Sequence, residues 1–338
     1  MDIIEQRKNN YKDFLNGKKD QIIMVEYNHG NLRPHPNQNY KERIEWALRC
    51  YELDYEKAHW LADDTVPYMQ PYTGTEIFAE ALGCRVHRSN DKMPFALPLI
   101  HEASEVNAIK PLSIYDCSLA KLFEIGDALK EKCGKNAVMQ LPDIQSPFDI
   151  AALIWEKGSF FIALIDEQEA VLELIQKVED VLFPFLDEWL RRYGTELVAH
   201  YPGYFMDRGI TLSEDEVGSI NSDMFKRFCE PSLVKMSKRY DGLGMHCCAN
   251  SQHQWQNFMN LPDLRVINIT HKPDICREAY AFFGDSLCHM HFWCGDGEPS
   301  ALWLQNYPKK ARVIIHFDTS DKEEAIHKLE ELRLGIYE

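Results

Sequence analysis

The sequence predicts an α/β protein built as a single (β/α)8 TIM barrel over residues 1–338, with an N-terminal helical extension. Short apolar segments rich in β-branched residues alternate with amphipathic helical segments, which is the pattern of a parallel sheet covered by helices. The chain has room for about eight such units, enough to close a barrel. No G-x-G-x-x-G motif follows an early strand, so the sequence does not favour an open dinucleotide-binding sheet.

Runs of Val, Ile and aromatic residues mark the predicted strands. They lie at 21–30, 136–141, 195–201, 240–247, 264–269, 286–293 and 311–317. A helix is predicted over 40–62, where apolar residues recur at helical spacing.

A second, longer helix is predicted over 166–193. Asp166 and Glu169 have the spacing of a capping box, Gly194 is placed to end the helix, and Pro184 is expected to kink it. One face is expected to be buried, with Val171, Leu174, Ile175, Val178, Leu182 and Phe185.

Composition excludes several partners. The formal net charge is −16 and no dense Lys/Arg cluster occurs, so we expect no nucleic acid and no anionic membrane surface as partners. The first residues are polar and no run of about 18 apolar residues occurs, which predicts a cytoplasmic protein without membrane spans. The ten cysteines are then expected to be reduced thiols.

A His-x-Cys pattern, His246 and Cys248 in "GMHCCAN", stands at the end of a predicted strand. Residues two apart in a strand point to the same side, and in a barrel that side faces the C-terminal opening. Imidazole and thiolate both suit Zn²⁺, but a catalytic zinc needs a third ligand, for which Cys294 and His316 are the candidates. The alternative interpretation is a core histidine beside buried free thiols.

Several segments together resemble the uroporphyrinogen decarboxylase superfamily, which includes zinc-dependent methyltransferases acting between methylcorrinoids and thiols. They are "MQPYTGTEIFAEALGCRV" (69–86), "DIQSPFDIAALIW" (143–155), the helix at 166–193, "LSEDEVGSINSDMFKRFCEPSLVKM" (212–236) and "GMHCCANSQHQWQNFMNLPDLRVINI" (244–269). They occur in register over most of the chain. The resemblance implies a TIM barrel.

The branch of the superfamily is indicated by two stretches. The decarboxylase proper carries an arginine-rich segment after its first strand, which suits a polycarboxylate substrate, whereas "VEYNHGNLRPHPNQNY" has only Arg33, together with the acidic Glu26. The methyltransferases use a His-x-Cys pair, which His246 and Cys248 match, and a later Cys, which has no clean match. The resemblance therefore implies Zn²⁺, a small methylated substrate or thiol, and a methylcorrinoid supplied by a corrinoid-binding protein.

Further site residues are predicted at strand ends. Asp64 falls where the decarboxylase family has a catalytic carboxylate, and Glu26 and Asp215 are the other candidate catalytic acids. The candidate substrate-binding residues are His29, Tyr201, Tyr204 and Glu214. Each has an ordinary structural alternative: a solvated turn, helix first-turn acids or core packing.

Two rival functions stay open at this stage. One is a metal-free decarboxylase of a tetrapyrrole or another polycarboxylate, with Asp64 stabilising positive charge. The other is a non-catalytic barrel that binds a corrinoid protein or another ligand, because a fold alone does not fix a function.

Overall fold

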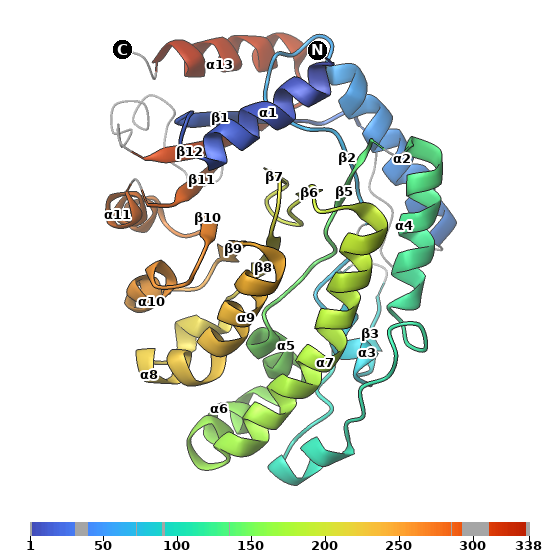
Figure 1. Ribbon diagram of the computed structural model, residues 1–338, viewed down its shortest axis with the longest axis vertical. Helices are drawn as coiled ribbons and strands as arrows, with labels where there is room; N and C mark the ends of the chain where they lie inside the picture. The colour runs from blue at the N-terminus through green and yellow to red at the C-terminus, as the bar shows by residue number, and fades with distance from the viewer. Residues whose placement is uncertain are drawn as a thin grey trace.

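The computed structural model describes residues 2–30, 40–71, 73–89, 92–134, 136–284, 286–292 and 311–335. The strands are β1 Gln21–Tyr27, β2 Tyr68–Met69, β3 Val86–His87, β4 Phe95–Ala96, β5 Val138–Gln140, β6 Leu197–Val198, β7 Phe205–Met206, β8 Ile210–Ser213, β9 Leu243–Cys247, β10 Leu264–Ile269, β11 Cys288–Phe292 and β12 Arg312–Thr319. Figure 1 shows helices packed around the strands.

The α-helices lie between groups of these strands along the chain. They are α1 Ile3–Leu15, α2 Tyr40–Lys57, α3 Ile77–Ala81, α4 Ala120–Cys133, α5 Pro147–Ile154, α6 Lys157–Asp166, α7 Gln168–Tyr193, α8 Ser222–Met224, α9 Glu230–Tyr240, α10 Trp255–Met259, α11 Pro273–Phe283 and α13 Lys322–Gly335. Short 3₁₀ helices lie at Ala103–Ala108, Glu216–Ser219 and Gln252–Gln254, and a π-helical turn lies at Phe225–Cys229.

Two sheets form the predicted TIM barrel. Six parallel strands pair in the order β1-β12-β11-β10-β9-β8, and a second sheet has the order β2-β5-β6-β7. On one side the sheets meet where the Asp64 amide donates to the Ile23 carbonyl at 2.8 Å. On the other side, a parallel bridge joins Gln145 to Ser213, and the Ser213 amide donates to the Ile144 carbonyl at 2.9 Å. The fold predicted from the sequence is confirmed.

A hairpin interrupts the regular barrel pattern. The sequence predicts one strand over 195–201, but β6 covers only Leu197–Val198 and pairs antiparallel with β7. The chain between them turns through a cis peptide at Tyr201–Pro202. The next strand, β8, continues the barrel beside β9, and neither β8 nor β2 was predicted.

The long helix differs from the prediction at its start. Helix α6 ends at Asp166, Glu167 precedes α7, and Asp166 is therefore not the cap of the long helix. The predicted C-terminal Gly194 is confirmed, with φ 98°. Helix α7 includes Pro184, and the predicted apolar face is buried.

The N-terminal helical extension, α1, packs against the N-terminal ends of the strands. Arg7 forms a buried ion pair at 2.8 Å with Asp63, just before β2, and Lys8 pairs at 3.0 Å with Glu196, just before β6. Arg312, at the start of β12, donates to the Phe14 carbonyl at 3.1 Å. These contacts close one end of the barrel and leave the opposite end, the barrel mouth, for a functional site.

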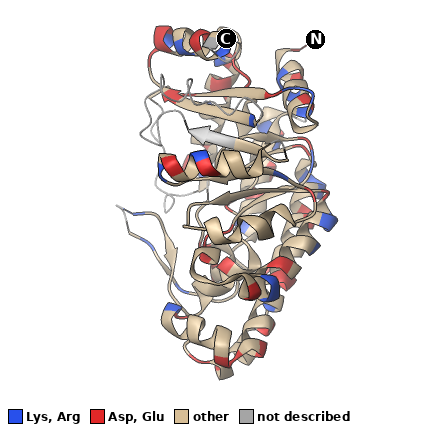
Figure 2. Ribbon diagram, turned by 90° about the vertical axis from the view of Figure 1, so that its left-hand side faces the viewer, with Lys and Arg blue, Asp and Glu red and all other residues tan. Residues whose placement is uncertain are grey.

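In the described residues, no helix is long and apolar enough to cross a bilayer. The described cysteines are free thiols, as expected. Basic and acidic residues are interspersed along the helices in Figure 2.

Candidate metal centre

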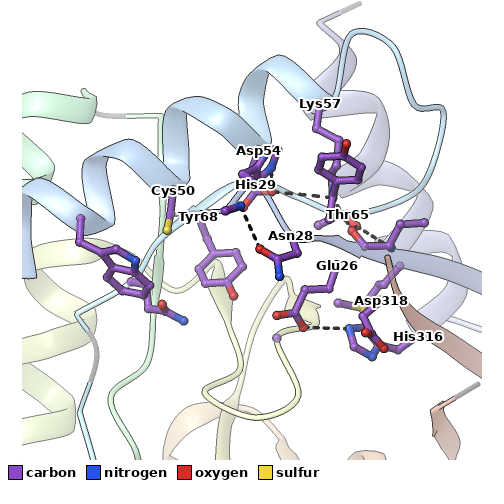
Figure 3. A pocket seen from close by; sticks show the side chains of 17 residues that line it. Glu26, Asn28, His29, Cys50, Asp54, Lys57, Thr65, Tyr68, His316 and Asp318 are labelled. Atoms are coloured by element: carbon purple, nitrogen blue, oxygen red, sulfur yellow. Dashed lines mark hydrogen bonds and ion pairs between the residues drawn. The ribbon is translucent and has the colours of Figure 1, made fainter. Parts of the chain in front are cut away.

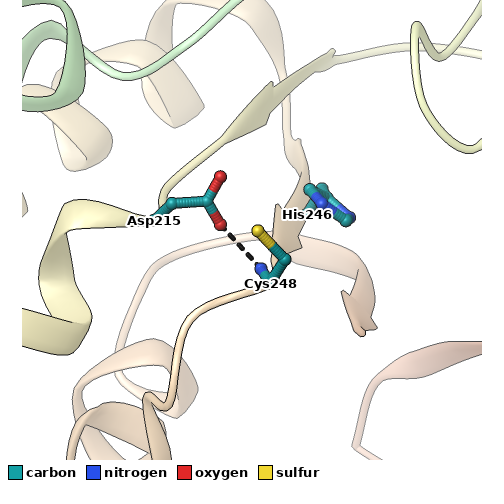
Figure 4. Close-up of side chains that lie close together, drawn as sticks. All are labelled: Asp215, His246 and Cys248. Atoms are coloured by element: carbon teal, nitrogen blue, oxygen red, sulfur yellow. Dashed lines mark hydrogen bonds between the residues drawn. The ribbon is translucent and has the colours of Figure 1, made fainter. Parts of the chain in front are cut away.

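Three metal-ligating side chains meet at the barrel mouth. His246 lies near the end of β9, Cys248 follows that strand, and Asp215 lies two residues beyond β8, which pairs with β9. One donor atom of each residue lies within 4.8 Å of the others, and Figure 4 shows the three side chains together. The structure therefore brings together the predicted His-x-Cys pair and one of the predicted acids.

The imidazole of His246 is held by the neighbouring strand. Asn268 lies opposite His246 in the β9–β10 register, is fully buried, and has its Oδ1 2.5 Å from His246 Nδ1. The hydroxyl of Thr270 donates to the same oxygen at 3.2 Å. Because this oxygen accepts hydrogen bonds, it favours the tautomer with the proton on Nδ1, which leaves the Nε2 lone pair for a metal.

The thiol of Cys248 lies beside a carboxylate. The Cys248 amide donates to Asp215 Oδ1 at 2.6 Å. Partial burial, and then the charge of Asp215, raise the pKa of the Cys248 thiol to about 11. At neutral pH this sulfur is therefore protonated unless a positive charge, such as a metal ion, favours the thiolate.

A buried acid positions Asp215. Asp149, in the first turn of α5, accepts hydrogen bonds from the Asp215 amide at 2.7 Å and the Glu216 amide at 3.0 Å. Burial, followed by the charge of Asp215, raises the pKa of Asp149 to about 7. Glu214 is fully buried near Asp149, and burial raises its pKa. The predicted substrate contact of Glu214 stays a prediction, and its buried side chain gives that contact no support.

The donor set fits zinc. Imidazole nitrogen, thiolate sulfur and carboxylate oxygen are its three usual protein donors, and catalytic zinc sites have three protein ligands and one open position. Among the described residues, Asp215 rather than His316 completes the set. His316 lies on β12, separated from β9 by β10 and β11, and its Nε2 pairs with Glu26 Oε2 at 3.3 Å. Cys294 lies outside the described residues.

A cavity of about 440 Å³ opens at the same mouth, on the side of β1 and β12. Glu26 and His29, both predicted site residues, line it, and so does His316 (Figure 3). Other lining residues include Trp46, Asp54, Lys57, Tyr68, Gly203 and Asp318. Gly203 belongs to the turn of the β6–β7 hairpin, and Tyr201 of the same turn packs edge-on against His246 with ring centroids 5.1 Å apart. One turn thus contacts both the cavity and the metal-ligating cluster.

Two predicted site residues, Asp64 and Tyr204, are buried in the protein. Asp64 is 2% exposed, and its carboxylate accepts hydrogen bonds from the Ile23 amide at 3.0 Å and Asn10 Nδ2 at 2.7 Å. It joins α1 to β1 and does not line the cavity, so the geometry gives no support to a catalytic role. Tyr204 is 1% exposed, with its hydroxyl packed against Gly244, so the geometry gives no support to substrate binding by this residue.

Sequence reasoning missed Asp143 and His200. His200 Nε2 lies 3.4 Å from Asp143 Oδ2. Burial raises the pKa of Asp143 to about 7. The charge of His246 lowers this pKa, and the charge of Asp215 raises it further. Asp143 follows the predicted strand at 136–141, and its position just after a strand was the signal available in the sequence.

Comparisons with known proteins agree with this architecture. A solved structure of a methyltransferase from Methanosarcina mazei superposes with a TM-score of 0.68 at 12% sequence identity, covering 98% of this chain and 99% of that one. This likeness shows a shared fold. No curated protein matches the chain. The sequence model of the family described as uroporphyrinogen decarboxylase matches residues 72–306, which is more than half of the chain. The chain belongs to the uroporphyrinogen decarboxylase family.

Proposed function

We propose that this protein is a zinc-dependent methyltransferase that moves a methyl group between a small methylated substrate or thiol and a corrinoid bound to a partner protein. The observation that carries the proposal is the convergence of Asp215, His246 and Cys248 within 4.8 Å at the barrel mouth. The solved methyltransferase with the same fold supports the reaction class.

The chain's own residues prepare this centre in three ways. Asn268 orients His246 so that Nε2 is the coordinating atom. Asp149 holds the backbone of Asp215 and Glu216 and so places the carboxylate. The pKa of the Cys248 thiol is raised to about 11, so its sulfur is a strong electron donor once the thiolate forms.

Zinc bound by these residues would act as a Lewis acid on a sulfur or oxygen of the substrate. Tyr201 packs edge-on against His246 and so helps to fix the position of that imidazole. The cavity at the same barrel mouth, about 440 Å³, is within the size range of sites for small molecules, and the β6–β7 turn joins it to the cluster, so it is a candidate place for the substrate. The mouth itself is where a corrinoid protein would present its cofactor.

Metal analysis of the purified protein tests the site. We expect stoichiometric zinc in the unmodified protein, loss of zinc in Cys248→Ser, and unchanged zinc in the control Cys117→Ser, whose half-buried thiol is outside the cluster. Absence of zinc, or equal zinc in both variants, would contradict the metal assignment.

Methyl transfer from methylcobalamin to small thiols, and from methylated substrates to cob(I)alamin, tests the reaction. We expect activity that disappears in Cys248→Ser. Turnover of a porphyrinogen by the metal-free protein would instead support the decarboxylase. Stoichiometric zinc without methyl transfer in either direction, also with added corrinoid proteins, would support the non-catalytic barrel.

A further inference from the structure

Most of the charged groups that line the cavity at the barrel mouth are acidic. Glu26, Asp54 and Asp318 contribute three carboxylates, and Lys57 contributes one ammonium, so the described lining has a net formal charge of −2 with its histidines neutral. The chain as a whole carries −16. An anionic ligand would therefore meet repulsion both from the lining and from the protein's overall field.

The one lysine of this lining is already engaged. Lys57 is 1% exposed, donates to the Val25 carbonyl, and lies 3.5 Å from Asp63 and 3.8 Å from Asp54. These oxygens satisfy the ammonium group. Within the described part of the chain, the lining thus offers an anion no lysine or arginine that is available for pairing.

Aromatic rings complete the lining. Tyr27, Trp46 and Tyr68 all border the cavity, and they come from β1, α2 and β2. The faces of such rings attract cations, most strongly for Trp, and quaternary ammonium groups are characteristic ligands of aromatic sites. Carboxylates and aromatic faces together favour a cation that is also partly apolar.

We infer that this cavity binds a small organic cation carrying N-methyl groups, of the tetraalkylammonium class. A trimethylammonium group has the required charge and apolar surface and is small enough for about 440 Å³. The inference names the methylated substrate of the proposed methyltransferase and rests on that function for the fate of the methyl group. The binding itself rests on the cavity alone.

Calorimetric titration of the full-length protein with choline tests the inference. Its neutral isostere, 3,3-dimethyl-1-butanol, is the control for shape, and 3-mercaptopropionate is the anionic comparison. We expect choline to bind at least tenfold more tightly than either. Equal affinity for the isostere, or a preference for the anion, would overturn the inference.

Substitutions locate the binding. Glu26→Gln and Asp318→Asn remove one charge each from the lining and are expected to weaken choline binding several-fold. The matched control is Glu45→Gln on α2, because Glu45 is exposed, pairs with Lys41 and does not line the cavity. Unchanged choline affinity in both lining variants would show that the cation binds elsewhere and would contradict the assignment.

Failure of the two proposals can be told apart. Choline binding by the unmodified protein, if that protein held no zinc and transferred no methyl group, would support the cation site and refute the proposed reaction. Zinc binding and transfer to a thiol without choline binding would refute the cation site alone.

Discussion

Asn268 Oδ1 lies 2.5 Å from Nδ1 of His246, and both residues occupy matching positions on neighbouring parallel strands. The contact is made from a fully buried amide, so the orientation of the imidazole is set by the sheet itself.

Removal of this amide is expected to weaken zinc binding. Asn268→Ala leaves His246 free to rotate and to change tautomer, and loss of such a partner typically costs 10- to 100-fold in metal affinity. Competition with a chelator measures the change. Asn268→Asp, which keeps an acceptor oxygen, should restore most of the affinity. Asn257→Ala removes another buried amide, bonded to Ser222 and Gln254, and should leave zinc affinity unchanged.

Neutralising Asp215 is expected to lower the pKa of Cys248 in metal-free protein. Burial is the largest cause of the raised pKa of Cys248, and the charge of Asp215 is the second. Asp215→Asn should therefore lower this pKa from about 11, although burial keeps it above the ordinary value for a thiol. The pH dependence of iodoacetamide alkylation reports the thiolate. Asp241→Asn is the control, because Asp241 is an exposed acid at the C-terminal end of α9 that pairs with Arg208. An alkylation profile that is identical in all three proteins would show that Asp215 does not act on this sulfur.

Stability is expected to rise with pH across the range from about 3 to 6.5 because of His289. Burial lowers the pKa of this histidine to about 3, so the unfolded chain binds a proton that the folded chain does not. The contribution is complete above the unfolded pKa and falls as pH decreases, by up to about 1.4 kcal/mol per pH unit. Urea unfolding at pH 4.5, 5.5 and 7 measures this slope.

The matched substitutions are His289→Leu and His59→Leu, the latter at an exposed position. The slope should decrease in the first variant and persist in the second. A decrease that is the same in both would assign the pH dependence to other groups.

Asp64 is expected to matter for stability and not for the metal. Asp64→Ala leaves the Ile23 amide and Asn10 without their acceptor, which should cost roughly 1–3 kcal/mol in the free energy of unfolding. Zinc content of the folded variant should equal that of the unmodified protein. Loss of methyl transfer with stability and zinc intact would restore the catalytic role predicted from the sequence.

The sequence was sufficient where a signal is local. The apolar runs of β1, β9 and β10 and the face of α7 are each visible within a few residues, and so is the His246-x-Cys248 pair at a strand end. The missed strands include β2 and β8, which are two and four residues long and too short for a periodicity to emerge.

The third member of the candidate metal cluster, Asp215, was not predicted as a metal ligand because the strand before it was not predicted. Asp215 becomes a neighbour of Cys248 only because β8 pairs with β9, and β8 was not recognised. His316 was favoured because it also ends an apolar run, but strand order places it beside Glu26. Pairing between distant segments, rather than residue type, decides which strand-end groups meet.

Helix α1 plugs the far end of the barrel through Arg7, Lys8 and the carbonyl of Phe14. For the proposed reaction, the described part of the chain then has one open end, the barrel mouth, for two ligands of very different size. A small substrate has to bind before a protein-sized partner covers that opening, and its product dissociates only after the partner has dissociated. The architecture itself thus imposes an order on the encounter.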